Sequence, residues 1–240
     1  MLRMNQELNR LGGMFKMKIF QKIGGFAAFY LAMAYLVTIP IFIFILDYPS
    51  IVEPSQKMDL IVNQTALMYL TNIISYVFFG FFLILLNLSL YEKLNDKSPN
   101  MMKVATVIGI IWGCLLIGSG MVANAGMTQA IALFKDNPDQ GTTLWCGIEA
   151  VANGMGGQNG EILGGVMTLL ISIAGLRSGL LPKRLNYLGI ILGTIGIISI
   201  VPGLTDLCSV FGMIQIIWFI GIGVVLLKQP QMKAVYNLRE

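Results

Sequence analysis

Long apolar runs alternate with short polar and charged stretches along the whole chain. Each run reaches the length of about 20 residues that an α-helix needs to cross a bilayer core of about 30 Å. None shows the alternation of polar and apolar residues that is typical of a transmembrane β-strand. The pattern therefore predicts an all-α, polytopic membrane protein built as a bundle of six transmembrane helices. The predicted spans cover residues 23–46, 67–90, a run from about 104, a run ending near 176, 185–201 and 207–227.

The third and fourth predicted spans are longer than a crossing requires. They extend over residues 104–134 and 144–176, which are thirty-one and thirty-three residues. Each has about ten residues beyond the number that crosses the hydrocarbon. We expect this surplus at the outer side, where it either extends the hairpin beyond the membrane or folds back as an interfacial or re-entrant segment.

The longest predicted connection is DYPSIVEPSQKMD, at residues 47–59. Its two prolines, Pro49 and Pro54, predict a segment with little helix, because proline lacks an amide hydrogen and clashes with the preceding turn. The other connections are short, so neighbouring spans are expected to pack as antiparallel hairpins.

The distribution of charged residues predicts how the bundle is oriented in the membrane. Only 12% of the residues are charged, against about 25% in an average soluble domain. Fourteen of the sixteen lysines and arginines fall in residues 1–22, in the turns after spans two and four, and in the tail. By the positive-inside rule this places both termini in the cytoplasm of a multi-pass inner (plasma) membrane protein. We therefore predict a cytoplasmic interfacial segment (1–22), a transmembrane domain (23–227) and a cytoplasmic tail (228–240), with lipid as a partner and no nucleic acid.

Two carboxylates stand apart from the turns and tails, at Glu149 and Glu161. Glu161 lies in NGMGGQNGEILGG, residues 153–165, which contains six glycines. A carboxylate at membrane depth is costly and marks a candidate functional site. One interpretation makes Asn159 a helix N-cap with Glu161 in the first turn, where its charge offsets the helix dipole.

The other interpretation is a helix broken at the glycines, with its polar groups facing an outward-opening vestibule between spans three and four. The candidate ligand-binding residues are Glu161, Asn159, Gln158, Asn153, Asn124, Gln129 and Glu149. In an antiparallel hairpin Asn124 and Asn153 come to about the same depth and are able to form one polar layer. Polar residues inside other spans, such as Tyr35, Asn72 and Tyr76, are expected to form interhelical hydrogen bonds.

Small residues at three- and four-residue spacing allow helix backbones to approach closely. Gly109 and Gly113 show this spacing in span three, and Gly157, Gly160 and Gly164 show it in span four, next to Gly165. We expect Gly109, Gly113, Gly164 and Gly165 to bring spans three and four together.

The content of histidine and cysteine limits the chemistry. The chain has no histidine and three cysteines, so no serine–histidine–aspartate triad and no histidine-ligated metal can form. We predict no catalytic residue, metal or cofactor and do not expect an enzyme. Cys146 and Cys208 both fall at the outer ends of predicted spans, where they either form a disulfide or pack as isolated small residues.

The stretch GLRSGLLPKRLNYLGIILGTIGI, residues 175–197, resembles a family of bacterial integral membrane proteins catalogued as domain of unknown function 4386. The closing span IQIIWFIGIGVVLLK is similar to that family as well. The resemblance implies a bacterial inner membrane but no activity and no site residues, so Arg177, Ser178, Gly179 and Pro182 are interpreted as a turn.

These observations favour a membrane protein that binds or transports a small molecule, a cation or a lipid headgroup, with Glu161 as the charged contact. The alternative is a non-transporting membrane subunit or sensor, whose polar groups only hold helices together and whose outer loops contact a protein partner. The expected partners are lipid, a small-molecule or cation ligand, and a second copy of the chain or another membrane protein.

Overall fold

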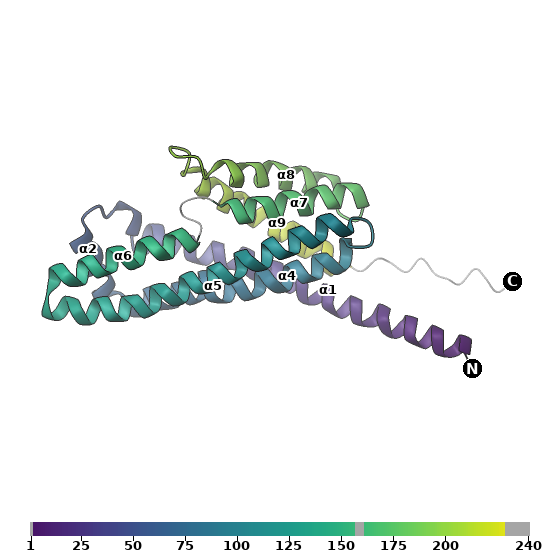
Figure 1. The fold of residues 1–240 in the computed structure, drawn as a ribbon, viewed down its shortest axis with the longest axis horizontal. Helices are drawn as coiled ribbons and strands as arrows, with labels where there is room; N and C mark the ends of the chain where they lie inside the picture. Colours follow the sequence, from purple (N-terminus) through teal and green to yellow (C-terminus); the bar gives the residue numbers. More distant parts are fainter. Residues whose placement is uncertain (1, 157–160, 229–240) are drawn as a thin grey trace.

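A computed structural model describes residues 2–156 and 161–228, with side chains from residue 19 onward, and this part of the chain is helical throughout apart from turns. Figure 1 shows the helices running roughly along one long axis. The helices are α1 (Leu2–Pro40), η1 (Ile41–Ile45), η2 (Tyr48–Ser50), α2 (Pro54–Asn63), α3 (Thr65–Asn72), η3 (Ile73–Phe78), α4 (Phe79–Leu94), α5 (Pro99–Asp136), α6 (Pro138–Gly156), α7 (Ile162–Ser178), α8 (Lys183–Ile198) and α9 (Leu207–Leu227).

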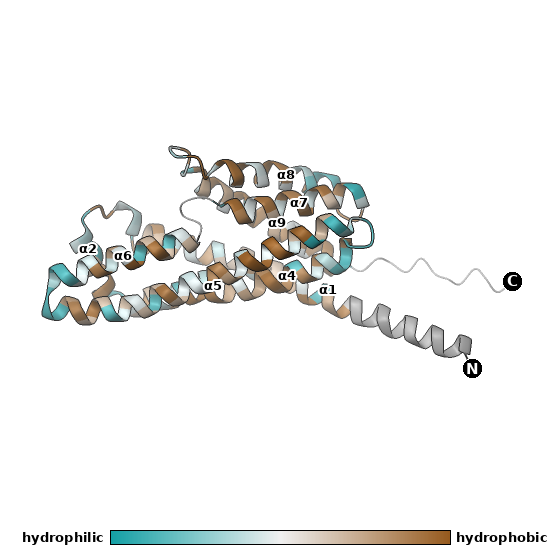
Figure 2. Cartoon of the chain, viewed as in Figure 1, coloured by the Kyte–Doolittle hydropathy of each residue, from teal (hydrophilic) through white to brown (hydrophobic). Residues whose placement is uncertain are grey.

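Four helical segments within the described ranges are long and apolar enough to cross a membrane. They are Ile19–Ile45, Thr65–Leu94, Pro99–Asp136 and Leu207–Leu227. In Figure 2 the middles of the helices are hydrophobic and the hydrophilic residues gather at their ends. The chain is therefore a helical membrane protein that crosses the bilayer more than once.

Two predicted spans appear as shorter helices. Helix α7 has 17 residues and α8 has 16. At 1.5 Å per residue they are about 25 Å long, a little less than the hydrocarbon thickness. The turn between them follows the local sequence, because Gly179 has a φ of 67° that suits glycine and Pro182 precedes the first residue of α8.

The outer parts of the third and fourth predicted spans extend along the bundle axis. Helix α5 is one unbroken helix of 38 residues, about 57 Å long. Helix α6 runs back along it, so that Gly126 lies against Ile148 and Gly141 against Phe134. Helix α6 ends at Gly156 and α7 begins at Ile162, which divides the fourth predicted span in two.

The prediction of little helix after the first span is wrong for half of that connection. Helix α2 begins at Pro54 and contains the whole of PSQKMD. Proline is tolerated there because the first amide of a helix has no intrahelical partner. Only 47–53 lacks regular helix apart from the single turn of η2, and Asp47 reverses the chain with a φ of 48°.

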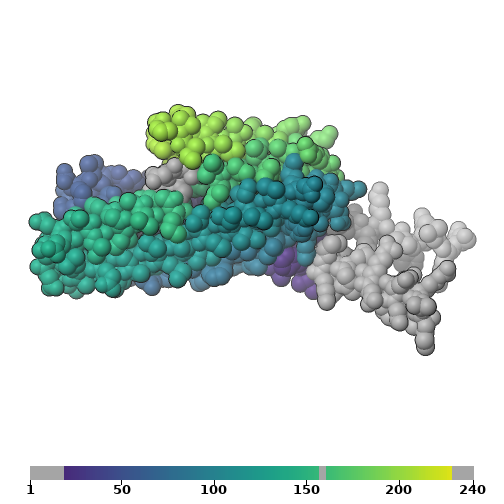
Figure 3. Space-filling view, in the orientation of Figure 1, coloured from purple at the N-terminus to yellow at the C-terminus, as the bar shows by residue number. Residues whose placement is uncertain are grey.

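Two hydrophobic cores hold the molecule together. The larger one combines side chains of α1, α4, α7, α8 and α9 with the first half of α5, and Leu83, Ile171 and Phe219 are fully buried in it. The smaller one joins the region 46–68 to the second half of α5 and to α6 through Met58, Ile61, Met127 and Trp145. We call these two parts the main bundle and the outer lobe. Figure 3 shows the green segments of α7 and α8 lying along one part of the length of the teal α5.

Glycines do bring helix backbones close together, but the predicted pairing of spans is largely wrong. A Cβ on Gly113 would lie 2.9 Å from the carbonyl oxygen of Gly80, and Gly109 faces Asn87, so both pack on α4. Gly165 packs on α8, where a Cβ would lie 2.8 Å from the carbonyl oxygen of Gly193. Only Gly164 meets α5, against the Trp112 ring. Glycine spacing marks a surface for close approach without specifying the partner helix.

Basic residues collect at the end of the bundle opposite the outer lobe. Gly25 of α1 packs against Leu227, so the start of the first crossing and the end of the last lie side by side. The α4–α5 and α7–α8 turns lie at the same end (Figure 1), since Gly24 packs on Ser89 near the end of α4 and Gly221 on Leu185 near the start of α8. That end carries Lys22, Lys93, Lys97, Lys103, Arg177, Lys183, Arg184 and Lys228.

Candidate functional site

A cavity of about 620 Å³ lies between the outer lobe and the main bundle. One wall comes from the last turns of α1 and from η1, and another from α3 and η3. Helix α6, Glu161 and the start of α9 complete it, together with the loop residues Tyr48, Pro49, Ile51, Thr205 and Asp206. Its polar side chains are Tyr35, Thr38, Tyr48, Lys57, Thr71, Asn72, Ser75, Tyr76, Glu149, Asn153, Glu161, Thr205, Asp206 and Ser209.

Two π-helical turns border this cavity. The first, η1, follows Pro40, which has no amide hydrogen to continue the α-helical ladder. The second, η3, interrupts the crossing segment Thr65–Leu94. Phe42 of η1 and Ser75 and Tyr76 of η3 line the cavity. Such wide turns inside long helices occur most often at functional sites.

Glu161 is positioned by the end of α8. Its backbone amide donates a hydrogen bond to the Ser199 hydroxyl at 3.0 Å, and its carbonyl accepts one from Gly165 at 2.7 Å. Ser199 is fully buried and its hydroxyl donates to the Gly196 carbonyl at 2.7 Å, which fixes it. The Glu161 backbone is thereby held where the beginning of α7 meets the end of α8.

The Glu161 side chain turns into the cavity wall. Its Oε2 is buried and has no hydrogen-bond partner among the described residues. Tyr35 and Tyr76 line the same cavity as Glu161. Burying a carboxylate oxygen without a partner costs free energy, so this arrangement favours a ligand that supplies a hydrogen bond or a positive charge.

The structure corrects the expected capping of α7. Glu161 itself occupies the N-cap position, one residue before the helix, and makes no side-chain capping bond. A side chain in the first turn would lie beside the free amides and offset the dipole directly. Gln158, Asn159 and the glycines Gly157 and Gly160 lie outside the described residues.

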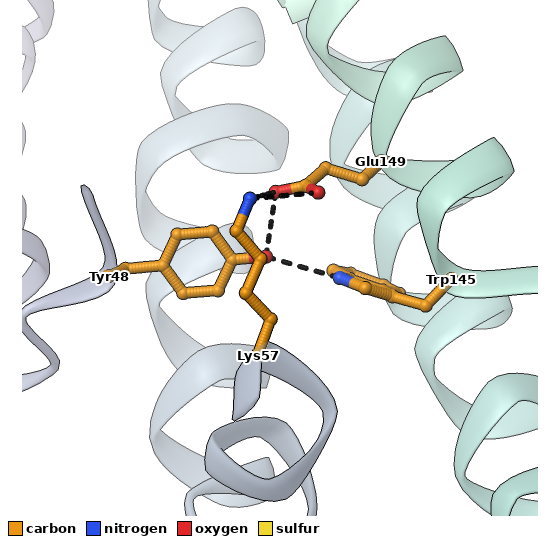
Figure 4. Close-up of polar contacts among 4 residues, drawn as sticks. All are labelled: Tyr48, Lys57, Trp145 and Glu149. Carbon is orange, nitrogen blue, oxygen red and sulfur yellow. Dashed lines mark hydrogen bonds and ion pairs between the residues drawn. The ribbon is translucent and has the colours of Figure 1, made fainter. Parts of the chain in front are cut away.

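Glu149 belongs to a second polar cluster, drawn in Figure 4, whose Tyr48, Lys57 and Glu149 line the same cavity. The Lys57 ammonium lies 3.1 and 3.2 Å from its two carboxylate oxygens, and the Tyr48 hydroxyl donates to it at 2.7 Å. Trp145 donates its indole N–H to the Tyr48 hydroxyl at 3.1 Å. The Lys57 nitrogen also lies 5.0 Å from the centre of the Tyr48 ring, within the range of a cation–π contact.

This cluster keeps the Tyr48 hydroxyl protonated. Burial raises the pKa of Tyr48 above its ordinary value, and the hydrogen bond to Glu149 and the negative charge of that residue raise it further. The hydroxyl therefore acts as a donor to Glu149 at any physiological pH. The four side chains join the outer loop, α2 and α6 across the cavity mouth.

The expected polar layer of Asn124 and Asn153 is replaced by a different pair. The side-chain N–H of Asn72 donates a hydrogen bond to the side-chain oxygen Oδ1 of Asn124 at 2.9 Å, and both residues are buried. Asn153 lines the cavity, whereas Asn124 faces α3. The helices pair with Ser119 opposite Ala152, so Asn153 lies about six residues, or about 9 Å, from the position opposite Asn124.

The vestibule expected between spans three and four is likewise displaced. Leu116 is the α5 residue in the cavity wall, and Gln129 of α5 is exposed on the surface away from it. The predicted residues that line the cavity are Glu149, Asn153 and Glu161. Tyr35, Asn72 and Tyr76, expected only to bond other helices, line it too.

Tyr48, Lys57 and Trp145 were not among the site residues predicted from the sequence. Glu149 lies 101 residues from Tyr48 and 92 from Lys57, so local spacing carries no sign of these contacts. One signal was present, since Lys57 is one of only two basic residues predicted on the outer side, where Glu149 was also placed.

The cysteines and the acidic side chains lie apart from one another in the described residues. Cys114, Cys146 and Cys208 are all free, so the conceivable disulfide between the last two is absent. No group of three or more acidic or cysteine side chains with metal-binding geometry occurs within residues 2–156 and 161–228. The chemistry on offer is a carboxylate, several hydroxyls and aromatic rings, which suits binding.

Comparison with known proteins yields no match to a protein family, to a curated protein or to a solved structure. The resemblance of residues 175–228 to the domain of unknown function therefore stays a prediction.

Proposed function

We propose that the protein is a six-helix inner-membrane protein that binds a small molecule, a cation or a lipid headgroup in the cavity between the outer lobe and the main bundle. Binding from the outer side, with transport of the bound ligand, is the function that the geometry supports best. The observation that carries the proposal is the buried Glu161 carboxylate, without a described partner, in the wall of a cavity of about 620 Å³.

The size and lining of the cavity support a ligand. Sites for small organic molecules usually measure about 300 to 1,000 Å³ and combine an apolar wall with a few convergent polar groups. Here Phe42, Phe79, Leu116 and Met213 supply apolar surface, and Glu161 and the tyrosines supply polar groups. The two π-turns widen α1 and the Thr65–Leu94 crossing at this level.

The proposed topology adds α7 and α8 to the four long crossings. These two helices pack on one another along their length and on α5 and α9, in the layer that contains the main core. Their shortness is compatible with crossing where flanking residues reach the interface. With six crossings the basic end is cytoplasmic, and the cavity opens on the outer side.

The test is a ligand-induced thermal shift of the purified protein in detergent. A panel of inorganic cations, organic cations, organic anions, neutral solutes and lipid headgroups is applied to the wild type, to Glu161→Gln and to Asp139→Asn. Asp139 is an exposed acid at the start of α6 and serves as a matched control. We expect at least one panel member to stabilise the wild type and the control, and to lose its effect on Glu161→Gln.

Absence of any stabilising ligand, together with a loss of stability in Glu161→Gln, would instead assign the carboxylate a purely structural role. Transport is then tested by uptake of the stabilising compound into proteoliposomes. A bound but untransported compound would favour the sensor or subunit function.

A further inference from the structure

The cavity contains an imbalance of charge. Its acidic side chains are Glu149, Glu161 and Asp206, and its basic side chain within the described ranges is Lys57. Lys57 is paired with Glu149 at 3.1 Å. The lining is therefore acidic, with Glu161 and Asp206 lacking a basic partner among the described residues, which favours a cation over an anion.

One wall of the cavity already shows how this protein holds an ammonium group. The Lys57 nitrogen is bound by the Glu149 carboxylate and faces the Tyr48 ring at 5.0 Å. Carboxylate and aromatic ring together replace part of the hydration that the cation loses.

The same cavity contains a second carboxylate and further phenol rings with no ammonium group beside them in the described residues. Glu161 supplies the carboxylate, and the half-buried Tyr35 and Tyr76 supply the rings. Glu161 Oε2 is buried and lacks a partner in the described part of the chain. Phe79 packs edge-on against Tyr35 at 5.0 Å and extends the aromatic wall.

The remaining lining selects against a bare metal ion. Ile39, Ile43, Leu116 and Met213 supply apolar surface around the polar groups. A small inorganic cation needs several oxygen ligands to replace its water, whereas an alkylated ammonium is weakly hydrated and gains from apolar and aromatic contact.

We infer that the cavity binds an organic ammonium cation, whose charge contacts the Glu161 carboxylate between Tyr35 and Tyr76 and whose apolar substituents fill the space toward Met213. This inference rests on the proposed function and specifies its ligand. The ammonium group belongs either to a free amine or to the headgroup of a phospholipid.

The experiment compares benzyltrimethylammonium with benzyl alcohol and with benzoate, which keep the aromatic body but are neutral and anionic. Binding is measured by isothermal titration calorimetry at constant ionic strength, on wild type, Glu161→Gln, Tyr76→Leu and Asp139→Asn. We expect saturable binding of the ammonium alone, at least a tenfold loss in Glu161→Gln, a several-fold loss in Tyr76→Leu and no change in Asp139→Asn. If Glu161→Gln does not fold, two results still test the inference. They are the preference of the wild type among the three probes and the loss of ammonium affinity in Tyr76→Leu.

Binding of benzyl alcohol or benzoate as strong as that of the ammonium, or an undiminished affinity in Glu161→Gln, overturns the inference. The proposed function survives that result if another ligand class binds in a Glu161-dependent manner, and fails only if no class binds. Nanodiscs of two lipids without net charge distinguish the two sources: weaker ammonium binding in phosphatidylcholine than in monogalactosyldiacylglycerol identifies the headgroup as a competitor, and equal binding identifies a free amine.

Discussion

The Tyr48 hydroxyl donates a hydrogen bond of 2.7 Å to the Glu149 carboxylate, and so connects the loop after the first crossing to helix α6. The same hydroxyl accepts the indole N–H of Trp145. One phenol therefore satisfies a donor and an acceptor on α6 at once. Because this loop lies beside the cavity mouth, its contact with α6 sets the shape of the entrance.

Tyr48→Phe tests this connection while keeping the ring. The variant leaves the Trp145 N–H without its acceptor and removes one donor from Glu149. We expect a loss of about 1 to 2 kcal/mol in unfolding free energy, seen as a lower melting temperature by circular dichroism in detergent. Tyr69→Phe, at a tyrosine that is 43% exposed, is the control and should melt with the wild type. Equal melting of Tyr48→Phe and wild type would refute the structural role.

The Lys57–Glu149 ion pair is only partly buried, with side chains 23% and 18% exposed. Lys57→Met and Glu149→Gln are each expected to destabilise, and the double variant to lose less than the sum of the two. Solvent screening limits the coupling to on the order of 1 kcal/mol. A double-mutant cycle of melting in low and high salt measures it, and the coupling should shrink at high salt. Strict additivity would show that the pair contributes nothing.

The buried Asn72–Asn124 hydrogen bond joins α3 to α5. Asn72→Ala removes the donor and leaves the side-chain oxygen of Asn124 without this hydrogen bond, which should lower the unfolding free energy by about 1 to 3 kcal/mol. Asn100→Ala, at an exposed position near the start of α5, is the matched control and should melt within about 0.5 kcal/mol of the wild type. Thermal melting of the two variants side by side decides, and a larger loss at Asn100 would contradict the burial of the pair.

Gly165 allows α7 and α8 to touch through their backbones. A Cβ there would lie 2.7 Å from the Ile197 amide nitrogen, so Gly165→Ala must push the helices apart. We expect a loss of about 1 to 3 kcal/mol. Gly154→Ala meets nothing within 4 Å and should be neutral or slightly stabilising, because alanine favours helix over glycine. Similar melting of both variants would disprove the close approach.

The proposed topology is tested by cysteine labelling in intact cells. Single cysteines replace the exposed residues Asp96, Gln140, Leu180 and Thr205 in a background lacking the three native cysteines. A membrane-impermeant maleimide should label positions 140 and 205 from outside, and positions 96 and 180 only after permeabilisation. Labelling of position 180 from outside would eliminate the crossing assigned to α7.

Hydropathy alone located the long crossings, because burying about 20 apolar residues in lipid requires no knowledge of neighbours. The last crossing, residues 207–227, coincides with α9. Helix α2 was missed because a proline excludes helix in the interior but not at the first position, and spacing does not distinguish the two.

Which helices pack against one another was harder to predict from the sequence. Gly113 was expected to face span four and faces α4, and Asn124 was expected beside Asn153 and bonds Asn72. The helix period fixes which residues share a face, while the choice of partner helix depends on the whole packing. Glu161 stood out because an ionisable group at membrane depth is unusual in any arrangement. Its aromatic neighbours required the structure.

The π-turn Ile73–Phe78 fixes the angular phase of one helix relative to its continuation. Each residue of an α-helix advances by about 100° around the axis. Excising a single residue from this turn would rotate all of α3 by that angle relative to α4, carrying Asn72 away from Asn124 and out of the cavity wall. The wider turn therefore lets α3 face the cavity and the second half of α5 while α4, its continuation, packs in the main core.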